Sequence, residues 1–238
     1  MLHSRMKFLA FAAVVVLLFP AAACSGGGES DDTAREISNE ELGQMVLGPE
    51  QFGPEFAGFS SGDENGPQTV EQIANEDDDP AAERADLEQH GFTDGYKMLY
   101  YTQQPPGGQV ASVGSLVYLF ETAEGAAGYL EDSIAEMRDD QEDEDPSAIF
   151  EWSDLDAGDE AVSLRFDGPQ PTDEGSTISL SGTVIFFRHG RIVAGMLLYG
   201  FALPDPEKQR LHGNMETLAS VMNDRITSVL ATAAAPSA

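Results

Sequence analysis

The segment 177–200 places the strongest constraint on the fold, because two apolar strand-like runs flank the dipeptide His189-Gly190. A glycine in so short a connection accepts the positive φ that tight hairpin turns require. In the first run, apolar residues at alternating positions share one side: Ile178, Leu180, Val184 and Phe186. Between residues 177 and 183 the intervening positions are serine or threonine, as in a strand with two different faces. The segment therefore predicts an antiparallel β-hairpin.

An amphipathic helix is expected directly after this hairpin. Asp205 is a candidate N-cap with Pro206 at the first helical position, and the helical pattern continues to about Ala231. Apolar residues recur along it at helical spacing: Leu211, Met215, Leu218, Met222, Ile226 and Val229. A helix with one apolar side needs a surface to cover, so we expect this C-terminal helix to pack on the hairpin.

A similar order of two strands and a helix occurs earlier in the chain. Strands are predicted at 96–102 and 110–120, joined by the turn sequence PPGG at 105–108. A helix capped by Thr122 then extends to about Arg138.

Further signals complete the predicted architecture. Ser38 and Glu41 have the spacing of a capping box, and a helix between Asp79 and Gly91 has an N-cap and a glycine stop. Residues 161–166 are strand-like. Together these elements predict an α+β fold with a mainly antiparallel sheet, amphipathic helices packed on it, and a C-terminal helix.

At the N-terminus, Arg5 and Lys7 precede an uncharged apolar run over residues 8–19 that ends at Pro20. A membrane-spanning helix needs roughly 20 such residues, so this run is too short to be one. A basic start, a short apolar segment and small residues at a cleavage site are typical of a secretory signal peptide. We therefore expect residues 1–23 to be removed on export.

The tetrapeptide Ala21-Ala22-Ala23-Cys24 resembles the lipobox of bacterial lipoproteins, whose cysteine becomes the first mature residue. The resemblance implies a diacylglyceryl thioether on Cys24 and an acyl chain on its amine, so the partner is the lipid bilayer. Position 21 is usually leucine in a lipobox, and an ordinary signal peptidase would also cut before Cys24, which leaves a soluble secreted protein as the alternative. Cys24 is the single cysteine and can form no internal disulfide, which favours lipidation.

Residues 24–37 are rich in glycine, serine, threonine and acidic residues, a composition that predicts a flexible acidic tether. The remaining residues, 38–238, are enough for a single domain with one core. The order of its elements is similar to that of PsbP-like extracytoplasmic domains. The stretches LEQHGFTDGYKMLYY and SLVYLFETAEGAAGYL also resemble sequences in uncharacterised bacterial lipoproteins, and this second likeness implies no activity.

The chain offers few of the spacings that common enzyme chemistries need. It has no H-E-x-x-H zinc motif, no P-loop and no G-x-G-x-x-G fingerprint, and we expect no nucleophile elbow. One cysteine and scattered histidines cannot form a structural zinc site. We therefore predict no catalytic residue, no metal and no cofactor, and a domain that is not an enzyme.

The remaining candidate residues have structural interpretations. We place His90 at the end of a helix, His189 in the hairpin turn and His212 beside the apolar stripe of the last helix. Trp152 is interpreted as a core or rim residue. The acidic stretch 140–151 lacks the glycine that an EF-hand calcium loop needs at its sixth position.

The net charge of the chain argues against some classes of binding partner. Acidic residues outnumber basic ones by 42 to 12, and the net charge is −30. Loss of the signal peptide removes Arg5 and Lys7 but no acidic residue, which gives −32 for the mature chain. Nucleic-acid binding depends on Lys and Arg side chains that neutralise phosphates, so no nucleic-acid partner is expected. Membrane contact should come through the acyl chains on Cys24 alone.

These observations favour a lipoprotein anchored to the extracytoplasmic face of the cell membrane, with a non-enzymatic domain that binds a small molecule or an envelope protein. A tethered hydrolase that uses carboxylates and a purely structural envelope protein are the alternatives. Two inward-facing carboxylates in a cleft, one with a raised pKa, would favour the hydrolase. An apolar pocket between the sheet and the helices would favour binding.

Overall fold

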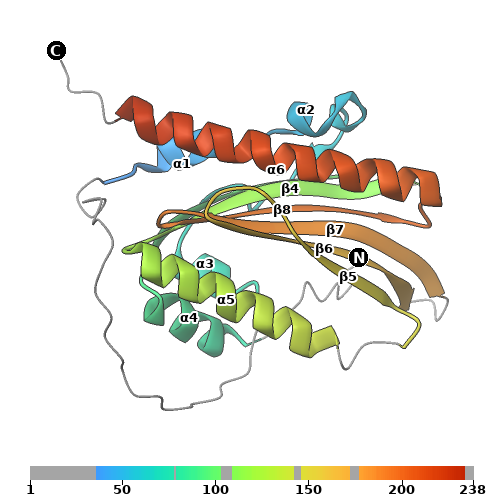
Figure 1. The fold of residues 1–238 in the computed structure, drawn as a ribbon, viewed down its shortest axis with the longest axis horizontal. Coiled ribbons are helices and arrows are strands. Elements are labelled where there is room, and N and C mark those ends of the chain that lie inside the picture. The colour runs from blue at the N-terminus through green and yellow to red at the C-terminus, as the bar shows by residue number, and fades with distance from the viewer. Residues whose placement is uncertain (1–35, 78, 103–108, 142–145, 172–176, 234–238) are drawn as a thin grey trace.

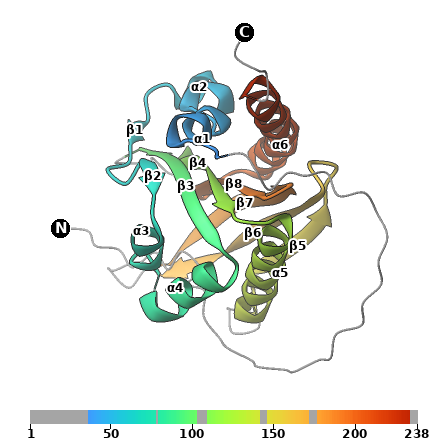
Figure 2. The same cartoon turned by 90° about the vertical axis from the view of Figure 1, so that its left-hand side faces the viewer.

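The structure of the protein is a computed structural model, and it describes residues 36–77, 79–102, 109–141, 146–171 and 177–233. The predicted signal peptide, Cys24, nearly all of the predicted tether and the PPGG sequence lie outside these ranges. Within them, an eight-stranded antiparallel sheet carries helices on both faces (Figures 1 and 2). The predicted α+β class, with a mainly antiparallel sheet, packed helices and a C-terminal helix, is confirmed. In the same ranges no helix is long and apolar enough to cross a membrane.

The sheet has the strand order β1-β3-β4-β8-β7-β6-β5, with β2 also paired to β3. Every pairing is antiparallel. The strand bounds are β1 Ser60–Ser61, β2 Gly66–Gln68, β3 Phe92–Tyr101, β4 Gln109–Phe120, β5 Ile149–Asp154, β6 Glu160–Pro171, β7 Thr177–His189 and β8 Ile192–Phe201. The central pair, β4 and β8, therefore joins the N-terminal and C-terminal parts of the domain.

The predicted hairpin is the β7–β8 pair, with its turn one residue later than expected. His189 pairs with Ile192, so the two turn residues are Gly190 and Arg191. Gly190 has a φ of 58°, which glycine adopts with little strain.

Seven helical segments cover the described sheet. Their bounds are α1 Asn39–Met45, α2 Pro49–Phe52, the 3-10 helix η2 Pro54–Phe56, α3 Val70–Ala74, α4 Pro80–Gln89, α5 Ala123–Asp140 and α6 Asp205–Ala233. The caps predicted at Ser38, Asp79 and Thr122 are confirmed: Ser38 and Glu41 form a capping box, and the Asp79 and Thr122 side chains accept hydrogen bonds from backbone N–H groups of α4 and α5. Gly91, with a φ of 73°, follows the end of α4.

Two hydrophobic clusters lie on opposite faces of the sheet (Figure 2). The larger one joins the sheet to α6, α1 and α2, and it includes Phe52 and Phe56. The smaller one joins the sheet to α3, α4 and α5. At one end of α6, the Arg225 Nη1 donates a hydrogen bond to the Val46 carbonyl oxygen at 2.6 Å, so α1 is attached to the C-terminal half of α6.

The α6 stripe is buried against the sheet as predicted, although its deepest contacts on β7 involve the partly polar side of that strand. Ser181, Thr183 and Ile185 are buried on the face that α6 covers. Leu180 and Val184, on the other face, are only half-buried. The hydroxyl groups beneath α6 have hydrogen-bond partners, His212 of α6 for Thr183 and Asp167 of β6 for Ser181, which is why they can be buried there.

Other boundaries differ from the sequence predictions. Helix α6 begins at Asp205 because the N–H groups of Glu207 and Lys208 bond to the Pro204 carbonyl oxygen, so Asp205 lies in the first turn. The sequence did not predict α3, which is one short helical turn capped by Thr69, or the exposed edge strand β5.

Candidate functional site

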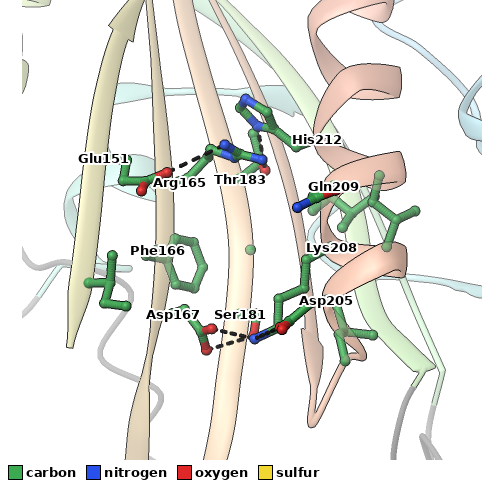
Figure 3. A pocket seen from close by; sticks show the side chains of 15 residues that line it. Glu151, Arg165, Phe166, Asp167, Ser181, Thr183, Asp205, Lys208, Gln209 and His212 are labelled. Carbon is green, nitrogen blue, oxygen red and sulfur yellow. Dashed lines mark hydrogen bonds and ion pairs between the residues drawn. The ribbon is translucent and has the colours of Figure 1, made fainter. Parts of the chain in front are cut away.

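A cleft lies between the β5–β6–β7 part of the sheet and the first turns of α6 (Figure 3). It encloses about 300 Å³, near the lower end of the roughly 300–1,000 Å³ that small-molecule sites have. The buried side chains Leu198, Leu203 and Leu211 form part of its wall. Charged and polar side chains line the rest, so the cleft combines an apolar wall with several fixed polar groups.

Two rows of cross-strand neighbours bring the polar groups together. Residues two apart on a strand point to the same face, so Arg165 and Asp167 of β6 both face α6. The antiparallel register places Glu151 on one side of Arg165 and Thr183 on the other, and it places Ser181 beside Asp167. The first turns of α6 lie across both rows.

His212 of α6 contacts the first row, which consists of Glu151, Arg165 and Thr183. The His212 Nδ1 lies 3.1 Å from the Thr183 Oγ1, and its Nε2 lies 3.0 Å from the Glu216 Oε1. Burial, together with the charge of Arg165, lowers the pKa of His212 although Glu216 opposes the shift. A neutral imidazole with its proton on Nε2 satisfies both contacts, donating to Glu216 and accepting from the Thr183 hydroxyl.

Lys208 of α6 contacts the second row, which consists of Asp167 and Ser181. Lys208 forms an ion pair with Asp167, and the hydroxyls of Ser179 and Ser181 donate to the Asp167 Oδ1 at 3.1 and 2.9 Å. Burial alone would raise the pKa of Asp167, but the hydrogen bonds from Lys208, Ser181 and Ser179 outweigh it and hold that pKa below its usual value. Asp167 is therefore an ionised acceptor at neutral pH and a poor proton donor.

Arg165 and Gln209 are the groups best placed to meet a ligand. Within the described ranges, the one hydrogen bond of Arg165 joins its Nη1 to the Glu151 Oε2 at 3.3 Å, which leaves further N–H groups for an acceptor. Gln209 is exposed on α6 and lines the same cleft (Figure 3). The arrangement suits a small polar molecule that accepts hydrogen bonds and also has an apolar part.

The structure gives the predicted site residues different places. Cys24 lies outside the described residues. His212, expected beside the α6 stripe, is buried and lines the cleft. Trp152 is half-buried on β5, where its indole N–H donates to the Gln141 Oε1 at 3.0 Å, and His189 contacts the Asn223 Oδ1 at 2.9 Å. Sequence reasoning missed Arg165, Asp167 and Lys208, although Lys208 is one of only three lysines in the chain, which is a signal that could have been used.

The pentapeptide GFSSG at 58–62 matches the G-x-S-x-G pattern of a nucleophile elbow, contrary to the expectation that no such elbow exists. A functional elbow places its serine on a sharp turn between a strand and a helix. Here Ser60 is exposed in the short edge strand β1 and pairs with Tyr101. The pattern therefore lacks the structural context of that motif.

His90, expected at the end of a helix, follows α4 and joins it to α5. Its Nε2 lies 3.3 Å from the Asp86 Oδ1 and 3.0 Å from the Asp132 Oδ2. The three ligand atoms lie within 4.8 Å of one another, so this is a group that could hold a metal ion. In the acidic stretch, residues 142–145 lie outside the described ranges, and Glu151 at the twelfth position pairs with Arg165.

The fold and the cleft define a class of protein: an α+β domain with one antiparallel sheet and a site between the sheet and its C-terminal helix. No protein-family model matches the chain, and no curated sequence is similar enough to count as a relative. Among solved structures, the extracellular domain of PknH from Mycobacterium tuberculosis is similar, with 10% identity and a TM-score of 0.48 over 82% of this chain and 98% of that one. A likeness at this level assigns neither a family nor a function.

Proposed function

We propose that this protein is an extracytoplasmic lipoprotein, anchored to the membrane through acyl chains on Cys24, whose domain binds a small polar ligand in the cleft beside α6. The signal peptide, the lipobox-like tetrapeptide and the acidic tether support the anchor. The cleft between the β5–β6–β7 part of the sheet and α6 is the observation that supports ligand binding.

The polar groups of the cleft favour binding over hydrolysis. A carboxylate-dependent hydrolase needs a carboxyl group that is protonated near neutral pH, whereas the environment of Asp167 lowers its pKa. Lys208 is held by the same interaction, and its pKa is raised mainly by the hydrogen bond to Asp167. Both groups are fixed in their charged forms, as is common where charges orient a ligand. For this cleft we therefore keep the prediction of a non-enzymatic domain. The carboxylates that meet the hydrolase criterion line a second cavity, where Glu83, with a pKa raised to about 7, lies with Glu76 and Asp77.

The ligand can be tested on protein purified from its native membranes. We expect native mass spectrometry of the detergent-extracted protein to reveal a bound small molecule. Arg165→Met keeps a long side chain but removes the hydrogen-bond donors, so it should reduce occupancy at least tenfold. Arg84→Met, on the opposite face in α4, is the matched control and should retain the ligand. Equal occupancy in both variants would contradict the cleft as the site, and native protein with nothing bound would favour a structural envelope protein.

The anchor has a separate test. Intact mass should show loss of residues 1–23 and a lipid-sized addition on Cys24, because two or more acyl chains are needed for stable attachment. Cys24→Ser should move the protein from the membrane fraction to the soluble fraction, whereas Ser25→Ala should leave it in the membrane fraction. A mature chain with a free Cys24 thiol would disprove lipidation.

A further inference from the structure

A second cavity lies on the opposite face of the sheet, between β4, β7, β8 and helices α3, α4 and α5. It encloses about 220 Å³, less than the roughly 300 Å³ at which drug-sized sites begin, so any occupant is small. Much of its wall is apolar or aromatic, with Leu116, Tyr118, Tyr129 and Phe186 among the lining residues, and the acidic residues Glu76, Asp77 and Glu83 line it as well. Any ligand there would be separated by the sheet from the cleft beside α6.

The carboxyl group of Glu83 in α4 lines this cavity without a partner. Glu83 is 6% exposed, and within the described ranges its carboxyl makes no hydrogen bond and no ion pair. A buried charge without a partner is unfavourable. Burial, with the charges of Asp77 and Asp86, accordingly raises its pKa to about 7.

Lys97, whose strand neighbour Leu116 lines the cavity, already has a partner. Lys97 pairs with Leu116 across β3 and β4, and Leu116 lines the cavity. The Lys97 Nζ lies 2.6 Å from both carboxylate oxygens of Glu76. Glu83 is therefore left without a counter-ion from the described part of the chain.

The aromatic walls complement a positive charge. The rings of Tyr118 and Tyr129 lie 6.0 Å apart at 64°, and Phe186 lines the same cavity. Burial raises the pKa of both tyrosines, so they remain neutral. The faces of such rings attract cations within about 6 Å.

We propose that this cavity binds a small organic cation, an amine or a quaternary ammonium, whose charge pairs with Glu83 while its apolar groups contact Tyr118, Tyr129 and Phe186. A neutral apolar occupant would leave Glu83 unpaired.

Choline is a suitable probe, because 3,3-dimethylbutan-1-ol has nearly the same shape without the charge. Isothermal titration calorimetry of the full mature protein in detergent should show choline binding, and Glu83→Gln should weaken it at least tenfold. Glu88→Gln, on the exposed side of the same helix, should leave the choline affinity unchanged. The neutral alcohol should bind more weakly and respond little to Glu83→Gln. Tyr118→Leu, which removes an aromatic face, should also weaken choline binding.

The pH dependence gives an independent readout. Choline keeps its charge at all pH values, and Tyr118 and Tyr129 stay neutral. The pH dependence of choline affinity should therefore come mainly from Glu83. With a pKa of about 7, its ionised fraction rises about tenfold between pH 6 and pH 8, and choline affinity should rise with it. In the Glu83→Gln variant, choline affinity should depend less on pH. The dependence that remains would come from the surrounding charged and titratable groups: Asp77, Asp86, His90 and the Glu76–Lys97 pair. No heat with choline, equal affinity in Glu83→Gln, or equal binding of the neutral alcohol would overturn the proposal.

Discussion

Replacing Met222 by alanine is expected to lower the free energy of unfolding by about 2–5 kcal/mol. Met222 is fully buried on the sheet side of α6, in the cluster that includes Met215 and Ile226 of the same helix. Most of the rest of this cluster belongs to the sheet and to α1 and α2. Because a close-packed core relaxes only partially around a deleted side chain, the substitution leaves a cavity.

Urea denaturation followed by circular dichroism would measure this change. Val221→Ala is the matched control, because Val221 adjoins Met222 on the same helix but is 45% exposed. A surface change of this kind should stay within about 0.5 kcal/mol of the wild type. Leu218, which is only half-buried, should give an intermediate loss when changed to alanine. Equal losses for Met222→Ala and Val221→Ala would mean that α6 does not cover the sheet.

Gly125→Ala should destabilise the protein by roughly 1–3 kcal/mol, as overpacked core substitutions do. Gly125 lies in the first turn of α5, where this helix passes close to the end of α4. An added Cβ atom would lie 2.1 Å from the His90 carbonyl oxygen. That oxygen is a backbone atom, so relief requires a shift of one helix relative to the other.

Gly213→Ala in α6 provides the comparison for this substitution, because nothing lies within 4 Å of its added Cβ. Alanine is favoured over glycine in a helix by about 0.5–1 kcal/mol, so this variant should be more stable than the wild type. Thermal melts of both variants should therefore shift in opposite directions. A stabilising effect of Gly125→Ala would show that helix propensity outweighs the contact with α4.

The elements that the sequence predicts well are those with local signals. The N-caps at Ser38, Asp79 and Thr122 act within three or four residues along the chain, and the apolar stripe of α6 repeats every turn. Strand β5 was missed because it is a mostly exposed edge strand in an acidic region. Helix α3 was missed because a single turn is too short to show periodicity.

The cleft could not be predicted, because its residues meet only through the strand register and the docking of α6. Asp167 and Lys208 are 41 residues apart in the sequence, and no local pattern links them. Alternation on β7 separates Ser181 and Thr183 from Leu180 and Val184, but it does not reveal which side α6 covers. Likewise, Glu83 of α4 meets Leu116 and Phe186 of the sheet only through the docking of that helix, which no local pattern predicts.

If the protein is anchored as we propose, the attachment of α1 to the C-terminal half of α6 affects how the domain is oriented relative to the membrane. Ser38, where the domain follows the tether, borders the same depression as Ser228 near the end of α6. Lys208, in the cleft, is twenty residues away along that helix, or about 30 Å at 1.5 Å per residue. In the anchored protein that we propose, α6 would thus act as a spacer between the attachment point and the cleft. The cleft would lie at the end of the domain remote from its attachment, where solutes arrive by free diffusion, and its occupancy should depend little on the composition of the bilayer.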